Sequence, residues 1–512
     1  MITFRDYTFL GTTQSLCPEC LALVPAKIVE RDGRVYFRKR CPTHGPREDF
    51  VCSDVKWFDR TETSLPGKVP LSYGIEPNRG CPYDCGLCTE HEQHTCLGLL
   101  EITSSCNLEC PMCFAASGPG GKHLSVEDCV RAIDRLVEVE GRPEILQLSG
   151  GEPTIHPQFL EILVYACEQP IDIVMINTNG IRLARDERFL EQVAEWRHRA
   201  EIYLQFDGFD EQGCESLRGE SLVETKLRAV EALGQIGMRT TLVSTLQPGI
   251  NEHEMGRLVQ FGTSRNWITG VSFQPATYTG RHVLPDELER RITFPDVIKG
   301  IEAQTDGEWL ESDFSPLPCA HPNGHSLAYA YRSNGKVVPL ARFIDLENHI
   351  DLLSGRITFN RERAKELIGE YLSRQACGLG GCGDSDNGNS RDATHRREDQ
   401  RFVESRLSTD DVTMKVAEEF FTRALSEDLQ PEDVFRITTT SFMDAYNFDV
   451  RQLMKSCVHH ILPSGHLIPF SAYNVLYRDG HVPLPPLKEI NRRHRGERRE
   501  ITVVQLVNEE VL

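Results

Sequence analysis

Residues 104–115 read SSCNLECPMCFA and place three cysteines, Cys106, Cys110 and Cys113, at the end of the apolar run LGLLEITSS, residues 97–105. Three thiolates on one tight loop can hold three corners of a cubane iron–sulfur cluster and leave its fourth iron without a protein ligand. A zinc site completed by a ligand from elsewhere is the alternative, although structural zinc usually takes four closed ligands. The spacing therefore indicates a metal centre at the end of a strand.

Apolar runs and amphipathic segments alternate on the C-terminal side of this loop. Together with residues 97–105, the strand candidates are residues 144–150, 172–179, 201–207, 239–246 and 270–276. The segments between them carry apolar residues at helical spacing, as in 125–140, 157–169, 188–199 and 222–237. Repeated strand–helix–strand units predict right-handed crossovers and a parallel sheet. Six strands are too few for a closed eight-fold barrel, so we expect an α/β fold with a partial (β/α)6 TIM-like barrel, with a doubly wound sheet as the alternative.

Polar and glycine residues follow these predicted strands. In either fold the functional site lies at the carboxyl ends of the strands, so the residues at these ends are the candidates. The second strand ends in LSGGEP, and glycine there permits close backbone approach. The full set of candidates is Gly150, Gly151, Glu152, Pro153, Asn177, Asn179, Gln205, Asp207, Ser244 and Gln274.

Two more groups of metal-ligand residues precede the barrel. RGCPYDCGLCTEHEQHTC at 79–96 can close a second [4Fe–4S] cluster, or a zinc site, on Cys81, Cys85, Cys88 and Cys96. LCPEC and CPTHG flank a hairpin with an Asp-Gly turn and supply a mononuclear site for zinc or rubredoxin-type iron. Its predicted ligands are Cys17, Cys20, Cys41 and His44, with Cys52 as a rival for the fourth position.

These motifs divide the chain into four expected parts. Residues 1–70 form an N-terminal metal-binding module of rubredoxin or zinc-ribbon type, and residues 71–96 a Cys-rich segment for the auxiliary cluster. Residues 97–290 form the barrel, and residues 291–512 a C-terminal α+β domain. Clustered cysteines in a chain that starts without a signal-peptide pattern favour metal over disulfides and a cytoplasmic location.

Composition narrows the functional classes further. The 512 residues include no run of about 18 apolar residues, which predicts no membrane span. The net charge of -20 argues against a broad nucleic-acid surface, because neutralising phosphates needs an excess of Lys and Arg. We therefore expect a small-molecule or lipid substrate and no nucleic acid as partner.

Seven short motifs, taken together, resemble those of the radical S-adenosylmethionine (SAM) superfamily. Within that superfamily they resemble the branch of the archaeal tetraether synthases, which join lipid chain ends, and of the class D methyltransferases, which are proposed to take a methyl group from a methylene-folate. The motifs are GCPYDCGLC, HTC, CNLECPMCF, SGGEPT, LQFDG, FMDAYNFD and PFSAYN, and they lie between residues 80 and 474.

The resemblance implies a chemistry for the barrel. A [4Fe–4S] cluster on Cys106, Cys110 and Cys113 would bind SAM and reduce it to a 5′-deoxyadenosyl radical, which removes a hydrogen from an unactivated C–H bond. The turn Gly150–Pro153 would take the amino group of SAM, and the remaining strand-end residues would complete the cofactor site. An external electron donor, a ferredoxin or flavodoxin, is implied as well.

The expected outcome is a new carbon–carbon bond. Coupling of lipid chains, as in tetraether synthases and with peripheral membrane contact, is the first hypothesis. Methylation of a pterin or another small molecule, as in class D enzymes, is the alternative. A lipid substrate predicts a long apolar tunnel, whereas a pterin predicts a polar pocket lined with aromatic side chains. A non-catalytic iron–sulfur or zinc scaffold is the hypothesis from another class.

The chain departs from the family pattern in its C-terminal part. Gly324 and Ser471 stand where the pattern is expected to have cysteines, so a third cluster there is absent or differently ligated. The cysteines left to form one are Cys319, Cys377, Cys382 and Cys457.

Overall fold

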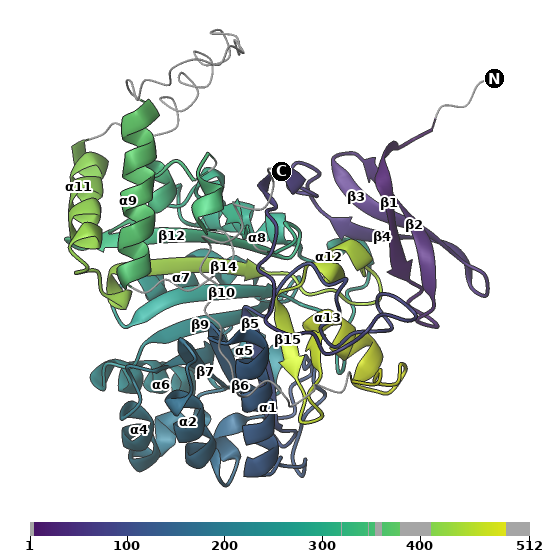
Figure 1. The fold of residues 1–512 in the computed structure, drawn as a ribbon, viewed down its shortest axis with the longest axis horizontal. Helices are drawn as coiled ribbons and strands as arrows, with labels where there is room; N and C mark the ends of the chain where they lie inside the picture. Colours follow the sequence, from purple (N-terminus) through teal and green to yellow (C-terminus); the bar gives the residue numbers. More distant parts are fainter. Residues whose placement is uncertain (1–4, 319, 347, 354–360, 379–410, 488–512) are drawn as a thin grey trace, which may run out of the picture.

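A row of eight parallel strands forms the centre of the part of the chain that the structure describes (Figure 1). This computed structural model describes residues 5–318, 320–346, 348–353, 361–378 and 411–487. The six strands predicted for the barrel are all present, in their expected order. They are β5 (Leu97–Thr103), β6 (Ile145–Gly150), β7 (Ile173–Thr178), β8 (Ala200–Gln205), β9 (Thr240–Leu246) and β10 (Ile268–Pro275).

The helices between these strands cover the outer side of the sheet. The four predicted helices correspond to α1 (Val126–Glu140), α2 (Phe159–Glu168), α4 (Glu187–Ala194) and α6 (Val223–Gln235). Further helices lie between or after them: α3 (Ile181–Arg185), α5 (Glu211–Arg218), α7 (Met255–Thr263) and α8 (Phe294–Gln304). Successive residues of β5 point to opposite faces of the sheet. Leu97 and Leu99 line a cavity on one face, whereas a Cβ on Gly98 would lie 2.9 Å from Leu136 of α1 on the other.

Strands from the C-terminal part of the chain extend the central row at both edges. β14 (Val434–Thr440) pairs in parallel with β10, and β15 (Val458–Ile461) pairs in parallel with β5. Antiparallel strands continue the sheet beyond them: β11 (Ser315–Pro316), β12 (His325–Ser333), β13 (Lys336–Pro339) and β16 (Leu467–Pro469). The sheet thus runs across the domain boundary expected near residue 290. β15 is only four residues long, too short to show a period in the sequence.

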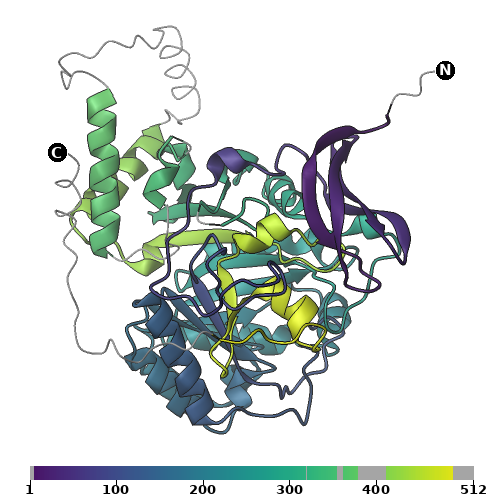
Figure 2. The same ribbon diagram turned by 45° about the vertical axis from the view of Figure 1, so that its right-hand side comes forward.

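The N-terminal module is a separate four-stranded antiparallel sheet, seen on the right in Figure 2. Its strands are β1 (Thr8–Leu16), β2 (Leu23–Arg31), β3 (Arg34–Cys41) and β4 (Gly45–Cys52). The predicted hairpin turn is confirmed, because Asp32 and Gly33 both have positive φ, 53° and 77°, between β2 and β3.

Buried polar contacts fix this module against the segment 444–449. Lys39 Nζ donates to the backbone oxygens of Ala445 and Tyr446 at 3.3 and 2.6 Å and lies 3.0 Å from the Asp49 carboxylate. Thr13 Oγ1 donates to Asp449 at 2.6 Å. Burial lowers the pKa of Lys39, although Asp49 opposes that effect. The buried Lys39 ammonium group and the Thr13 hydroxyl therefore attach the module to the rest of the fold.

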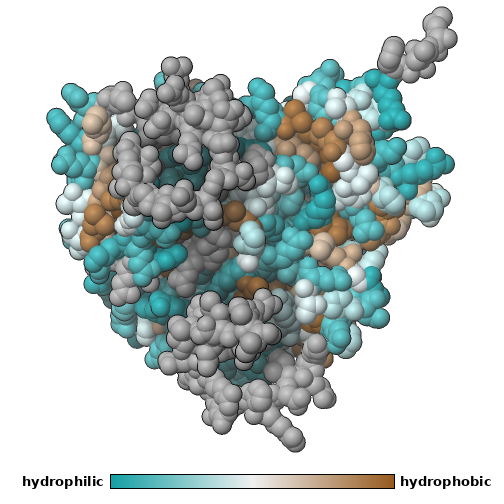
Figure 3. Space-filling model, turned by 45° about the horizontal axis from the view of Figure 1, so that its top comes forward, coloured by the Kyte–Doolittle hydropathy of each residue, from teal (hydrophilic) through white to brown (hydrophobic). Residues whose placement is uncertain are grey.

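The remaining helices of the described part are α9 (Arg361–Gly378), α11 (Asp411–Leu425), α12 (Val450–Met454) and α13 (Phe470–Ala472). α11 packs beside α9 and against β12. Figure 3 shows one face of the molecule, on which apolar side chains form small patches among polar ones. None of the helices in the described ranges is both long and apolar enough to cross a membrane.

Replacing Lys39 tests the attachment of the N-terminal module. Lys39→Met removes a buried cation from Asp49 and from three backbone oxygens, so we expect the free energy of unfolding to fall by about 3 kcal/mol. The exposed Lys27 of β2 provides the control, and Lys27→Met should change it by about 0.5 kcal/mol or less. Urea denaturation measures both; equal effects of the two substitutions would contradict a buried anchoring role for Lys39.

Candidate functional site

A cavity of about 190 Å³ opens at the carboxyl ends of the strands. Cys106, Cys110 and Cys113 all line it, as the position of their loop after β5 predicts. The C-terminal part contributes to the same site. It supplies Thr440 at the end of β14, Val458 of β15, Phe442 and Phe470 to the lining. The site is therefore built from every part of the central row of strands.

The cysteine loop is held in place by backbone contacts. Cys106 N donates to Gly118 O at 3.0 Å, and Cys113 exchanges two backbone hydrogen bonds with Arg281. Burial raises the pKa of the Cys106 thiol to about 12, and the nearby Glu152, Cys110 and Cys113 raise it further. A thiolate at this position therefore needs a cation beside it, which an iron–sulfur cluster supplies.

Gly150 and Gly151 bring the turn after β6 against this loop. Gly150 has φ +126°, and a Cβ on it would lie 2.0 Å from Thr103 O. A Cβ on Gly151 would lie 2.2 Å from Ser105 O. Both glycines line the cavity, so no side chain separates the two backbones beside the cysteines. This open cradle suits a cofactor that rests on backbone groups.

Glu152 is buried behind the turn and is not among the described residues that line the cavity. Its carboxylate accepts hydrogen bonds from Thr154 N and Oγ1 at 3.1 and 2.7 Å, from Thr178 Oγ1 at 2.8 Å and from Asn179 N at 2.7 Å. Burial raises its pKa although these donors lower it. Through these contacts Glu152 positions Asn179, and its contact with the amino group of SAM stays a prediction. Pro153 begins the buried 3-10 turn Pro153–Ile155.

Four predicted amide side chains do face the cavity: Asn177, Asn179, Gln205 and Gln274. Asn179 Nδ2 donates to Asn107 Oδ1 in the cysteine loop at 2.7 Å. Gln205 Nε2 donates to Asn177 Oδ1 at 2.9 Å, and Gln274 Nε2 donates to Tyr203 Oη at 3.1 Å. The carboxyl ends of β7, β8 and β10 thus present amide and hydroxyl groups to one cavity.

Asp207 and Ser244 are buried and are not among the described residues that line the cavity. Asp207 forms a two-pronged ion pair with Arg218, at 2.7 and 2.5 Å, and lies 3.5 Å from Lys226 Nζ. Burial alone would raise the pKa of Asp207, but Arg218 and Lys226 lower it to about 2. Ser244 Oγ donates to Asp207 O at 3.3 Å. Both residues therefore support the site rather than face it.

Arg218 is a charged residue of the cavity lining that was not predicted from the ends of the strands. It ends α5, and its guanidinium donates to Gln205 Oε1 at 3.1 Å as well as to Asp207. The sequence stretch CESLRGE carries no motif that would single out this arginine. A signal was nevertheless present in the sequence. Asp207 lies two residues after the end of β8, and a buried carboxylate there needs a cation as its partner.

The second cysteine group is only partly assembled as predicted. Cys81, Cys85 and Cys88 line one small cavity, whose described lining does not include Cys96. The neighbouring Cys81 thiol, together with burial, raises the pKa of Cys85 well above its usual range. Cys96 instead lies directly before β5, where its Sγ is 3.4 Å from His94 Nε2. The polar stretch after Cys88 carries Cys96 to the amino end of that strand.

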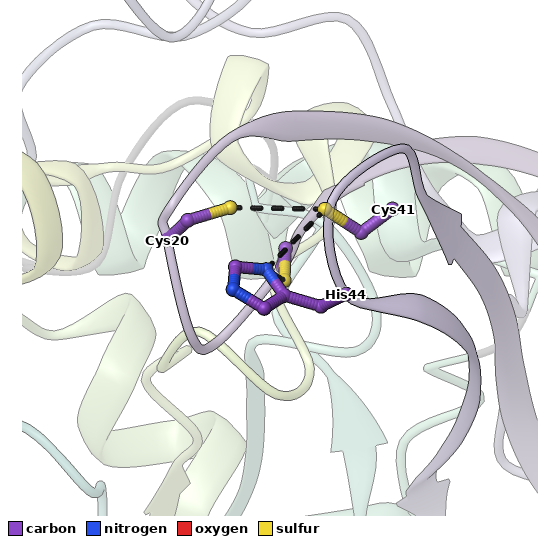
Figure 4. A group of neighbouring side chains, drawn as sticks. Cys20, Cys41 and His44 are labelled. Atoms are coloured by element: carbon purple, nitrogen blue, oxygen red, sulfur yellow. Dashed lines mark hydrogen bonds between the residues drawn. The ribbon is translucent and has the colours of Figure 1, made fainter.

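The N-terminal ligand group forms as predicted (Figure 4). Cys17 Sγ and Cys41 Sγ lie 3.5 and 3.6 Å from His44 Nδ1, and Cys20 Sγ lies 3.7 Å from Cys41 Sγ. The backbone N–H of His44 lowers the pKa of the Cys41 thiol to about 6, which favours the thiolate that a metal needs. Cys52, the rival ligand, is buried near Asp54, and burial raises its pKa to about 12. His44 is therefore the fourth member of the group.

Of the C-terminal cysteines, the structure describes the side chain of Cys457 alone. Cys457 is buried, and its backbone oxygen accepts hydrogen bonds from Cys96 N and Leu97 N. Cys319, Cys382 and the side chain of Cys377 lie outside the described residues.

Substituting Glu152 separates a positioning role from direct cofactor contact. In Glu152→Gln an amide N–H₂ would meet the donors that now point at the carboxylate, so we expect about 1–3 kcal/mol lower stability and weaker SAM binding. The exposed Glu168 of α2 is the control, and Glu168→Gln should change neither quantity. Thermal unfolding and anaerobic calorimetry measure them; weaker SAM binding at unchanged stability would instead indicate direct contact.

Removing the Asp207 carboxylate should be costly at every working pH. Asp207→Asn leaves two buried cations, Arg218 and Lys226, without their anion, so we expect a loss of about 3 kcal/mol or more. Because the folded pKa is lowered to about 2, the stabilisation is complete above the unfolded pKa and is lost only in more acidic solution. The difference from wild type should stay constant between about pH 6 and 8. A difference that varies over this range, or an equal effect of the exposed-site control Asp134→Asn, would contradict the assignment.

Comparison with known proteins agrees with this geometry. The profile of the radical SAM superfamily matches residues 100–262, which cover the cysteine loop and most of the central strands. The profile of the HMPTM N-terminal zinc ribbon domain matches residues 9–53. This range includes Cys17, Cys20, Cys41 and His44, whose ligand atoms all lie within 4.8 Å of one another.

Relatives fall into full-length and partial matches. The 7,8-dihydro-6-hydroxymethylpterin dimethyltransferase of Methanocaldococcus jannaschii is 33% identical over 515 residues, covering 94% of this chain and 97% of the relative. Mycofactocin maturase MftC of Mycobacterium ulcerans is 28% identical and covers 31% of this chain and 42% of its own. Among solved structures, Streptococcus suis SuiB bound to S-adenosylmethionine is 16% identical, with a TM-score of 0.33 over 42% of this chain and 47% of SuiB.

The match to the pterin dimethyltransferase extends over nearly the whole of both chains, and the superfamily profile falls on the strands that carry Cys106, Cys110 and Cys113. A radical SAM enzyme implies a [4Fe–4S] cluster and SAM, and the three thiols and the glycine cradle fit both. The chain belongs to the radical SAM superfamily, in the branch that contains the archaeal pterin dimethyltransferase.

Proposed function

We propose that the chain is a radical SAM methyltransferase that acts on a pterin. The observation that carries this proposal is the full-length relationship to a protein named as a 7,8-dihydro-6-hydroxymethylpterin dimethyltransferase. The comparisons thereby favour the methyltransferase alternative over the coupling of lipid chains, which was the first hypothesis from the sequence.

The lining of the cavity supports a heterocyclic substrate. A pterin presents several ring nitrogens and a carbonyl, which need hydrogen-bond partners when they leave water. Beyond the four amides of the strand ends, Gln147 and Tyr203 line the same cavity. These amides and the hydroxyl can bind the ring nitrogens and the carbonyl of a pterin. The polar part of the lining therefore supports the pterin alternative.

Aromatic side chains form another wall of the cavity. Phe442 and Phe470 have ring centroids 3.7 Å apart, and the Phe114 centroid lies 5.0 Å from that of Phe470. A flat heterocycle gains from stacking on such rings, in addition to the area that it buries. Amide groups together with aromatic rings in one lining are the combination expected for a pterin pocket.

The residues divide the work of the proposed reaction. The cluster on Cys106, Cys110 and Cys113 would supply the electron that cleaves SAM to a deoxyadenosyl radical. Gly150 and Gly151 would allow SAM to rest on backbone groups, and Asn179 would fix the cysteine loop beside it.

An auxiliary cluster on Cys81, Cys85 and Cys88 belongs to the same proposal. Three thiols around one cavity leave one iron of a [4Fe–4S] cluster for another ligand. The external electron donor, ferredoxin or flavodoxin, and the peripheral membrane contact both stay predictions. The metal of the N-terminal module is zinc or rubredoxin-type iron, with zinc favoured by the matching zinc ribbon profile.

An anaerobic assay tests the function. The reconstituted full-length protein is incubated with SAM, dithionite, a methylene-folate and 7,8-dihydro-6-hydroxymethylpterin, and the products are analysed by mass spectrometry. We expect 5′-deoxyadenosine and a pterin heavier by one or two CH₂ units. Cys106→Ala should abolish both products, because the cluster loses a ligand, while the core control Cys129→Ala should retain them.

The pattern of products distinguishes the alternatives. Deoxyadenosine without any gain in pterin mass, together with coupled chains when an archaeal lipid is supplied, would restore the lipid hypothesis. No deoxyadenosine from wild-type protein with a full complement of iron would contradict radical SAM catalysis and favour the scaffold hypothesis.

A further inference from the structure

A buried group of side chains at the amino ends of β5 and β6 has no part in the proposed reaction. His94 and Cys96 directly precede β5, and Glu144 directly precedes β6. The side chains of His94 and Glu144 are each 1% exposed, and Cys96 is completely buried. The site cavity opens at the carboxyl ends of these strands, and its described lining includes Leu97 and Leu99 of β5 but none of these three residues. We propose that His94, Cys96 and Glu144 bind a zinc ion that is separate from the ion of the N-terminal module.

The three ligand atoms converge on one point. His94 Nε2 lies 3.4 Å from Cys96 Sγ and 3.8 Å from Glu144 Oε1, and all three atoms lie within 4.8 Å of one another. Zinc bonds of about 2.3 Å to sulfur and about 2.0 Å to nitrogen, at a tetrahedral angle, place these two ligand atoms about 3.5 Å apart. The spacing fits a shared ion with only small movements.

The N-terminal module provides an internal comparison. There, the Sγ atoms of Cys17 and Cys41 lie 3.5 and 3.6 Å from His44 Nδ1, in a segment that matches a zinc ribbon profile. The sulfur–nitrogen distance between Cys96 and His94 is 3.4 Å. The two groups therefore have the same ligand spacing, although they lie in different parts of the fold.

A second carboxylate orients the imidazole for metal binding. Glu140, the last residue of α1, lies 2.9 Å from His94 Nδ1, and its other oxygen accepts a hydrogen bond from Thr95 N at 2.8 Å. With the Nδ1 proton donated to Glu140, Nε2 keeps its lone pair and points toward Cys96 and Glu144. Metal-bound histidines characteristically have a carboxylate on the ring nitrogen that does not bind the metal.

The charges of the group also call for a cation. Glu140 and Glu144 are both carboxylates with 1% side-chain exposure, and a Cys96 thiolate would add a further negative charge. His94, even if protonated, would supply one positive charge. A divalent ion balances the group, because buried anions persist when they are paired or coordinate a metal. Thiolate, imidazole and carboxylate together are a ligand set typical of zinc.

Such an ion would join segments that are distant in sequence. Cys96 and Leu97 donate backbone hydrogen bonds to Cys457 O, just before β15, while Glu140 and Glu144 flank the loop between α1 and β6. The ion would therefore attach the Cys-rich segment to the amino ends of three neighbouring strands. With a water molecule in the fourth position, the ion would hold these segments together whichever substrate occupies the cavity.

Metal analysis of the full-length protein tests the site. Zinc and iron per chain are measured by plasma mass spectrometry after anaerobic purification with zinc supplied. We expect Cys96→Ala to lose about one zinc and no iron. The matched control Cys129→Ala removes a buried thiol from α1, outside any ligand group, and should keep all the zinc. Glu140→Gln should weaken zinc retention against a chelator by about 10- to 100-fold.

A measurement on the wild-type protein covers the case in which Cys96→Ala does not fold. Zinc X-ray absorption should show about two sulfurs per zinc or fewer, because the three-sulfur ligand set of the N-terminal module is averaged with a one-sulfur site. Three sulfurs per zinc, or unchanged zinc in Cys96→Ala, would overturn the proposal in favour of a thiol–imidazole hydrogen bond. Loss of iron instead of zinc would overturn it in favour of an iron–sulfur cluster on Cys96. These readouts do not depend on methyl transfer to a pterin.

Discussion

Direct backbone contact between two loops is the constraint on which the site depends. The turn after β6 donates from Gly151 N to Thr103 O at 2.8 Å and from Glu152 N to Ser105 O at 3.0 Å. Any side chain at Gly150 or Gly151 would separate the two backbones. Because these hydrogen bonds tie the turn to the start of the cysteine loop, the three thiols and the cofactor cradle keep a fixed mutual position. The amides of the later strands, and Glu152 behind them, complete this arrangement.

The residues that face the cavity differ in charge from the residues behind them. The layer that faces the cavity is mostly neutral, made of amides, hydroxyls and aromatic rings, with Arg218 as its cation among the described lining residues. The anions that balance such cations lie below the surface, as Asp207 does for Arg218. A neutral, preorganised lining costs little to desolvate and still satisfies a polar ring. The same separation of supporting and facing residues explains why several predicted ligands lie just outside the cavity.

The central strands, the N-terminal hairpin and the location of the cysteine loop could be predicted from periodicity and spacing, because these features are local. Which strand-end residues face the cavity could not be predicted, because Glu152 and Gln205 look alike as polar residues after a strand. Arg218 was missed because it reaches the cavity from a helix. Cys96 was grouped with its neighbours in sequence, whereas the structure places it with Glu144, a partner brought close only by the pairing of β5 with β6.

The pairing of β15 with β5 also affects the order in which the protein matures. β5, which leads into the cysteine loop, gains one neighbour, β6, early in synthesis, but its other neighbour begins at Val458. A ribosome-bound chain that lacks β15 would leave one edge of β5 open, together with the part of the cavity lining that Val458 and Phe470 provide. The cysteine loop would thus remain accessible to cluster-loading factors until residues 458–470 have been synthesised, and would then be enclosed by them.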